Sequence, residues 1–142
     1  MLKVAFATDD RARVNQHFGA SVGFAIFALD GERARLGEVA EFAEETMDGN
    51  ENKLPAKIGA LSGCAAVYCL AVGGSAVRQL LADGVQPIRL EAETSIERLL
   101  ADLQRAVREG GVPWVEKAML ANEGRNKDEG RFERMADEGW QE

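Results

Sequence analysis

The sequence predicts an α/β fold in which helices flank a mixed β-sheet. Two strand-like segments meet at Asp30-Gly31, a dipeptide typical of hairpin turns. Residues 64–71 form an unbroken apolar segment, as expected of an interior strand that is covered on both faces. Helical and strand-like segments then alternate, which favours parallel connections between strands. The predicted order is β-β-β-α-β-α-β-α followed by a C-terminal tail.

The first half of the chain supplies the hairpin and the first helix. Strands are predicted at residues 2–8, 21–29 and 33–42. An acidic loop containing Asp48-Gly49-Asn50 follows the third strand. The helix predicted over residues 51–61 depends on apolar residues that recur at helical spacing, namely Leu54, Ile58 and Leu61.

The second half alternates helices with strands. After the interior strand, a helix is predicted over residues 76–82 and a strand over 85–90. Pro87 predicts an edge strand or a position at the strand start, because proline cannot donate a ladder hydrogen bond. The clearest helix spans residues 94–108, where Thr94 and Glu97 have the spacing of a capping box.

The C-terminal part is predicted to be a separate extension. A short helix over residues 114–121 precedes a charged tail in which Phe132, Met135 and Trp140 are spaced for docking. We therefore expect an α/β cofactor-binding domain over residues 1–110 and a helical, charged extension over residues 111–142.

Composition narrows the class of function. The net charge of −7 argues against general nucleic-acid binding, which needs basic residues to neutralise phosphates. No apolar segment approaches the roughly 20 residues that span a membrane. The N-terminus is interpreted as a first strand and not as a signal peptide, so we expect a cytoplasmic protein.

The two cysteines are predicted to act separately. On one strand, Cys64 and Cys69 would lie roughly 16 Å apart at about 3.3 Å per residue, which is too far for a disulfide. Their odd spacing predicts that they point to opposite faces of the sheet. Cys69, near the strand end, is a candidate iron–sulfur ligand, whereas Cys64 is expected in the core.

The loop after the first strand contains His17, the single histidine of the chain. Neutral imidazole is a good ligand for iron and other transition metals. Arg11 and Arg13 bring positive charge into this loop, as an anionic ligand would require, and Gly19 permits close backbone approach. A solvent-exposed histidine without any ligand is the alternative.

A glycine-containing turn, Gly73-Gly74-Ser75, lies between the interior strand and the following helix. Backbone N–H groups and a helix N-terminus at such a turn suit an anion, and open α/β sheets bind ligands at the carboxyl ends of their strands. A tight strand-to-helix turn without a ligand explains the pattern equally well.

Asp9 and Asp10 suggest a third candidate, a Mg²⁺ site for phosphoryl transfer, although a structural turn fits this pair better.

Several motifs in order resemble one known family. They are Val4–Asp10, Val14–Gly19, Asp48–Leu54 and Cys64–Cys69 with its continuation through Gly73–Leu81. Together they resemble the dinitrogenase iron–molybdenum cofactor biosynthesis family, over about residues 1–110. The ending Arg131–Trp140 is also similar to tails found in that family.

The resemblance implies a ribonuclease H-like fold and a carrier without catalytic residues. The cargo would be an iron–sulfur precursor of the NifB-co type or the finished iron–molybdenum or iron–vanadium cofactor (FeMo-co or FeV-co), bound transiently. Expected partners are the precursor-synthesis and scaffold proteins of nitrogenase cofactor assembly, with apo-dinitrogenase as a further candidate. In one group of members of this family the histidine of the Asn-x-His-Phe-Gly motif is implicated in cofactor binding, and it matches His17.

The combined prediction places His17 and Cys69 as metal ligands of the carried cluster. The remaining cofactor-binding candidates are Arg11, Arg13, Asn15, Gly73, Gly74 and Ser75. Two alternatives stay open: a Mg²⁺-dependent phosphoryl-transfer enzyme that uses Asp9 and Asp10, and an interaction module that binds no ligand.

Overall fold

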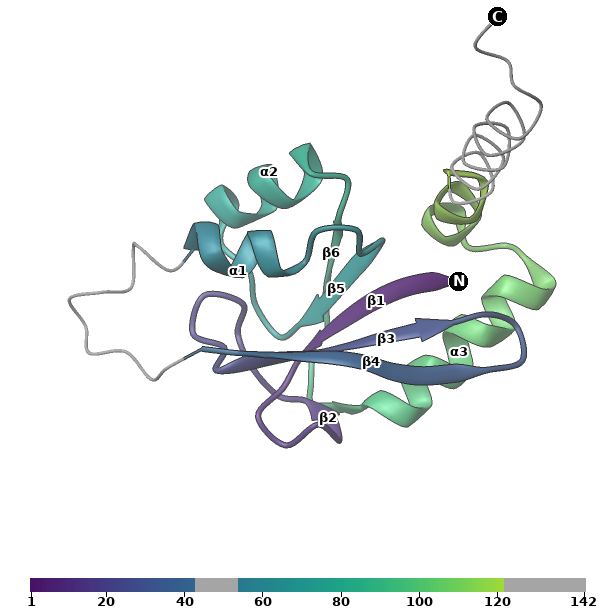
Figure 1. The fold of residues 1–142 in the computed structure, drawn as a ribbon, viewed down its shortest axis with the longest axis horizontal. Helices are drawn as coiled ribbons and strands as arrows, with labels where there is room; N and C mark the ends of the chain where they lie inside the picture. Colours follow the sequence, from purple (N-terminus) through teal and green to yellow (C-terminus); the bar gives the residue numbers. More distant parts are fainter. Residues whose placement is uncertain (43–53, 122–142) are drawn as a thin grey trace, which may run out of the picture.

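The structure, a computed structural model, describes residues 1–42 and 54–121 (Figure 1). Its elements in chain order are β1 (Leu2–Ala7), β2 (Arg13–Val14), β3 (Gly23–Leu29), β4 (Ala34–Glu41), α1 (Leu54–Ala60), β5 (Ala66–Cys69), α2 (Gly74–Ala82), β6 (Gln86–Arg89), β7 (Thr94–Ser95) and α3 (Ile96–Glu109). A further helix covers residues 113–121. The eight predicted elements each have a counterpart, and the short strands β2 and β7 are additional.

The main sheet is mixed, as predicted. Its strand order is β4-β3-β1-β5-β6. β1 pairs antiparallel with β3 and parallel with β5, and β5 pairs parallel with β6. Pro87 lies in β6 at the edge of this sheet, which confirms the edge prediction. The mixed α/β class is confirmed, while the ribonuclease H-like assignment stays a prediction.

The β3–β4 hairpin turns where Asp30-Gly31 predicted it. The Asp30 carboxylate accepts hydrogen bonds from the amides of Glu32 and Arg33, at 2.8 and 2.7 Å. The Asp30 amide in turn donates to the carbonyl of Arg33. The side chain of Asp30 therefore closes the turn, as short polar side chains often do.

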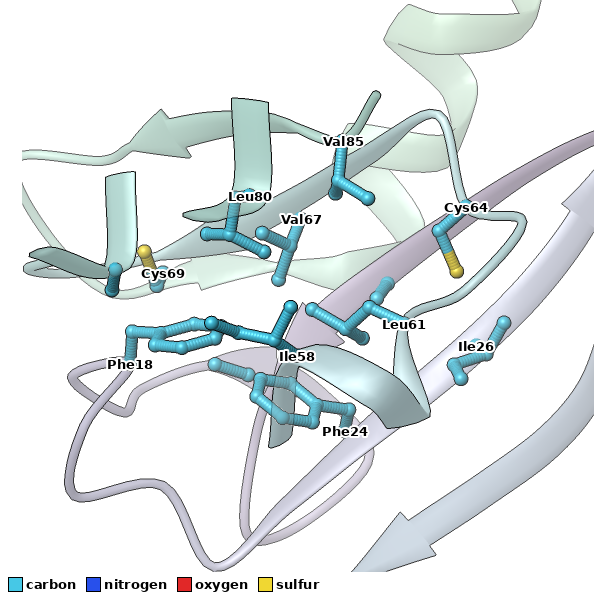
Figure 2. Packing of buried hydrophobic residues seen from close by; sticks show 13 residues of the cluster. Phe18, Phe24, Ile26, Ile58, Leu61, Cys64, Val67, Cys69, Leu80 and Val85 are labelled. Atoms are coloured by element: carbon cyan, nitrogen blue, oxygen red, sulfur yellow. The ribbon is translucent and has the colours of Figure 1, made fainter. Parts of the chain in front are cut away.

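Two hydrophobic clusters cover the two faces of the sheet. The first packs α1 and α2 against one face through Ile58, Leu61 and Leu80 (Figure 2). The second packs α3 against the other face through Leu99 and Leu103. Both clusters take alternate residues of β5, which is buried throughout, so the prediction of an interior strand is confirmed.

The small sheet β2–β7 corrects the prediction for the start of α3. Thr94 belongs to β7 and its hydroxyl donates to the carbonyl of Ala92, so it does not cap the helix. Ser95 is the N-cap, and its hydroxyl accepts a hydrogen bond from the amide of Arg98. The predicted cap was wrong by one residue because pairing with β2 holds Thr94 in an extended conformation.

The cysteines correct a second prediction. Cys64 and Cys69 both belong to the cluster under α1 and α2, and lie at opposite ends of it (Figure 2). Cys64 precedes β5, so strand alternation does not apply to it, and the prediction of opposite faces was wrong. Both are free thiols.

The helix over residues 113–121 packs on the second cluster. Val115 is fully buried, and Trp114, Ala118 and Met119 pack against the same cluster. Within the described part of the chain no helix is both long and apolar enough to cross a membrane. The predicted acidic loop, the Asp48–Leu54 motif up to residue 53, and the tail with Phe132, Met135 and Trp140 lie outside the described residues.

Candidate functional site

The segment that contains His17 is hydrogen-bonded to the chain that leaves β5. The amide of Leu70 donates to the carbonyl of Gln16 at 2.9 Å. The amide of Phe18 donates to the carbonyl of Ala71 at 2.7 Å. His17 therefore lies directly beside the segment that leads into Gly73 and Gly74, so two predicted parts of the site share one end of the sheet. We call residues 16–18 together with residues 70–75 the rim.

His17 itself is exposed on the rim. Over residues 1–42 and 54–121, its side chain has no hydrogen bond and no ion pair. The next residue, Phe18, is fully buried and packs against Phe24 with ring centroids 5.4 Å apart (Figure 2). The histidine is thus fixed through its neighbours while its imidazole stays available to a ligand.

The far side of the His17 segment is held by a lysine of α1. Lys57 is only 4% exposed, and its ammonium group donates to the carbonyl of Gly19 at 2.6 Å. A side chain at Gly19 would meet nothing within 4 Å. The fold therefore does not require glycine there, although glycine keeps the space next to His17 open.

The start of α2 forms the other half of the rim. Gly73 is the N-cap with φ −76° and ψ 159°, and no side chain of the described residues caps the helix. The first N–H groups of an α-helix have no partner within the helix and carry partial positive charge. A Cβ at Gly73 would meet nothing within 4 Å, so there is open space at this end of the helix, where N–H groups suit an anion. Ser75 is exposed and accepts a hydrogen bond from Gln79.

The loop between β1 and β2 is organised by Asp10. Its carboxylate accepts hydrogen bonds from the amides of Ala12 and Arg13, at 2.8 and 2.9 Å, and from the hydroxyl of Thr8. These bonds, the Ala12 and Arg13 amides first, lower the pKa of the Asp10 carboxyl. Asp10 therefore has a structural role in the turn.

Asp9 and Asn15 close the same loop. The Asn15 amide group donates to the Asp9 carboxylate at 2.7 Å, and its oxygen accepts from the Asp9 backbone amide. Neither aspartate therefore presents its carboxylate unengaged to a metal ion. Among the described residues no three histidine, cysteine or acidic side chains come together to hold a metal ion.

The two arginines predicted to balance the charge of a cluster are already paired. Arg11, in a left-handed conformation with φ 61°, contacts Glu41 at 3.1 Å. Arg13 lies 3.7 Å from both Asp10 and Glu93. Their charges are therefore partly neutralised within the protein.

Cys69 lies under the rim and not on it. Its side chain is fully buried, and burial raises the pKa of its thiol to about 11. Because the side chain is covered, its sulfur is not presented to a cluster that sits on the rim. The ligand role of Cys69 remains a prediction that this conformation does not favour.

Two further arginines reach the rim, and the sequence analysis missed both. Arg78, in α2, places a guanidinium nitrogen 3.6 Å from where a Cβ of Gly74 would be. Arg89, at the end of β6, donates from Nε to the carbonyl of Leu70 at 3.4 Å. Arg78 could have been identified from the sequence by its position one turn after the glycines. Arg89 could be found only from the pairing of β5 with β6.

The opposite end of the sheet carries a cavity of about 490 Å³. It lies between the start of β1, the end of α2 and the helix over residues 113–121. Lys3, Cys64 and Trp114 are among its lining residues. None of the predicted site residues lines it, so the cavity is separate from the rim.

Comparison with known proteins places the rim in a family context. Residues 1–106 match the family model described as "Dinitrogenase iron-molybdenum cofactor". The chain is 51% identical to Protein NifX of Azotobacter vinelandii over 142 residues, which is all of this chain and 89% of the relative. It is 35% identical to Protein NifX of Klebsiella pneumoniae over 137 residues, or 96% of this chain and 82% of the relative.

A solved structure supports the fold. The crystal structure of PH0822 aligns with a TM-score of 0.54 at 23% identity, covering 72% of this chain and 88% of that one. At this identity the similarity shows the fold alone.

Proposed function

Because the chain belongs to the dinitrogenase iron–molybdenum cofactor family, we propose that it binds an iron–sulfur cofactor cluster at the rim and hands it on to another protein. His17 coordinates iron, and the N–H groups at the start of α2 face the sulfide surface of the cluster. The protein contributes binding and no chemical step. Its place is in nitrogenase cofactor biosynthesis.

One observation carries this proposal. The Gln16–Leu70 and Phe18–Ala71 hydrogen bonds bring an exposed imidazole next to the start of α2, and within residues 1–42 and 54–121 neither the imidazole nor the helix start has a side-chain partner. An imidazole is a suitable iron ligand, and backbone N–H groups suit an anionic metal–sulfide surface. Both elements would be separated if the loop after β1 did not pair with the end of β5.

The small number of protein ligands fits transfer better than storage. An ordinary iron–sulfur protein uses four cysteine thiolates, whereas the rim offers one imidazole and backbone amides. A cluster held by few bonds can be released to a site with more ligands. We therefore propose transient binding of a NifB-co-type precursor or of finished FeMo-co or FeV-co. The proposed donors and acceptors are the precursor-synthesis and scaffold proteins, and apo-dinitrogenase.

The first test measures iron and sulfide in the protein after anaerobic purification from cells that make the cofactor. We expect both elements in the wild-type protein and a large loss in His17→Ala. His17→Cys should regain part of the iron, because a thiolate also coordinates iron. Iron-free wild-type protein would favour an interaction module that binds no ligand.

A matched control separates ligand loss from unfolding. Gln104→Ala alters a polar residue of α3, whose contacts lie on the other face of the sheet from α1 and α2. It should leave the iron content unchanged. The His17 variants should unfold at the wild-type temperature, because the His17 side chain is exposed and, within residues 1–42 and 54–121, has no hydrogen bond and no ion pair. Iron content equal in His17→Ala and Gln104→Ala would remove the imidazole from the proposal.

A further inference from the structure

Four arginines lie near the carboxyl ends of β1, β5 and β6, and they differ in whether carboxylates neutralise them. Arg11 pairs with Glu41, and Arg13 lies close to both Asp10 and Glu93. Within residues 1–42 and 54–121, Arg78 and Arg89 have no ion pair at all. The uncompensated positive charge is therefore at Arg78 and Arg89.

Arg78 lies near the N-terminus of α2, where a positive charge does not stabilise the helix. Its guanidinium folds back over Gly74, and no acidic residue lies in the first turn of α2. The partial charge at a helix N-terminus is positive, so a cation there is repelled by the helix itself. An anion placed before Gly74 would relieve this repulsion and would meet both the helix start and the guanidinium.

Arg89 reaches the rim at Leu70 from the edge strand β6. It is the register partner of Cys69, whose side chain lies on the α1 and α2 side of the sheet. Paired residues of neighbouring strands point to the same face, so Arg89 leaves the sheet on the side of α2. The backbone of Leu70 connects the two halves, because its carbonyl accepts from Arg89 while its amide donates to the carbonyl of Gln16, next to His17.

We propose that Arg78 and Arg89 form the anion clamp of the rim, and that they, and not Arg11 and Arg13, hold the negative charge of the carried cluster. This inference rests on the proposed function. Guanidinium groups are planar donors that suit extended anionic surfaces and stay charged at every physiological pH. The clamp selects cargo by its charge, while His17 selects it by coordination.

The experiment compares three double variants that each remove two positive charges. Arg78→Gln/Arg89→Gln removes the clamp, and Arg11→Gln/Arg13→Gln removes the paired arginines. Arg98→Gln/Arg105→Gln is the matched control, because both residues are exposed on α3 and have no ion pair in the described part of the chain. The probe is FeMo-co extracted from dinitrogenase, titrated anaerobically at low and high salt.

We expect the clamp variant to bind the probe about tenfold more weakly than the control at low salt. Its affinity should also fall less steeply as salt rises, since fewer charges remain to be screened. The Arg11→Gln/Arg13→Gln variant should stay within about threefold of the control. Arg78→Lys/Arg89→Lys should recover most of the affinity, because the charge is restored.

The outcomes separate the clamp from the carrier function. Wild-type protein that does not bind the probe overturns the carriage of finished FeMo-co, and the clamp that is proposed to hold its charge. Binding by wild-type protein that is equally weakened in the clamp and control variants overturns the clamp alone. A larger loss of affinity in Arg11→Gln/Arg13→Gln than in the clamp variant also overturns the clamp. It would show that the arginines of the loop after β1 bind the anionic cluster. Thermal unfolding of every variant identifies any loss that comes from misfolding.

Discussion

The backbone amide of Phe18 donates a 2.7 Å hydrogen bond to the carbonyl of Ala71, and this bond joins the loop after β1 to the loop after β5. The neighbouring Gln16–Leu70 bond makes a second connection. His17, between the two, is therefore held at the carboxyl end of β5 although it lies in no strand.

Gly73→Asp is expected to stabilise the protein and weaken cluster binding. The N-cap conformation at Gly73 suits an aspartate, whose carboxylate would accept from the first N–H groups of α2. The free energy of unfolding should rise by a few tenths of a kcal/mol, since glycine is only slightly worse at this position. Cluster affinity should fall, because the carboxylate occupies and repels the anion site. Urea unfolding and anaerobic titration measure the two effects.

Gly59→Ala is the control for that change. Gly59 lies within α1 and a Cβ there would meet nothing within 4 Å, so alanine should raise stability by about 0.5–1 kcal/mol. It should leave cluster affinity unaltered. Unchanged affinity in Gly73→Asp would show that the helix start does not face the cluster.

Phe18→Ala is expected to cost about 3–5 kcal/mol of unfolding free energy, because a fully buried aromatic side chain is replaced by a cavity. Phe18→Leu should cost clearly less. Denaturant unfolding measures both. If Phe18→Ala were nearly neutral, the packing of Phe18 against Phe24 would not anchor the His17 segment.

Asp10→Ala is expected to reduce the acid sensitivity of the fold. The pKa of Asp10 is lowered in the folded protein, chiefly by the amides of Ala12 and Arg13. Its carboxylate thus stabilises the fold above the unfolded pKa of about 4, and this contribution is lost as pH falls through the lower, folded pKa. The wild-type and Asp10→Ala stabilities should converge in that acidic range. A constant difference between them at every pH would contradict this role.

Both cysteines are expected to react slowly with thiol reagents in the folded protein at pH 8. Burial raises the pKa of Cys64 and of Cys69 to about 11, so the reactive thiolate is scarce. Denaturation should restore rapid reaction of both. Rapid labelling of Cys69 in the native protein, mapped by mass spectrometry, would restore it as a candidate ligand.

Ser95→Ala is expected to destabilise the protein by about 1 kcal/mol through loss of the α3 cap. Thr94→Ala should cost less, because the Thr94 hydroxyl bonds only to the nearby Ala92 carbonyl at an exposed position. Thermal unfolding compares the two. A larger effect at Thr94 would return the cap to the position that the sequence suggested.

The sequence predicted an element well where the contacts that determine it lie within one short segment. The hairpin at Asp30 depends on side-chain bonds within four residues, and α3 depends on its own apolar stripe. The strand β7 could not be predicted this way. It forms because Thr94 pairs with Val14, a residue 80 positions earlier, and this pairing also moved the helix cap to Ser95.

The same contrast between local patterns and long-range contacts applies to the residues of the site. His17 and the turn at Gly73 were visible as residue types that suit an anionic metal cluster. The pairing states of the arginines were not visible, because Arg11 meets Glu41 across 30 residues and Arg89 meets Leu70 across 19. The burial of Cys69 likewise depends on α1 and α2 packing over it.

The double connection around His17 has a kinetic consequence. A single residue between two backbone hydrogen bonds has little freedom to swing toward an incoming molecule. Docking should thus proceed without a preceding rearrangement of the protein. In stopped-flow mixing, the observed rate of loading should rise linearly with cluster concentration and show no plateau, since a plateau would report a slow opening step.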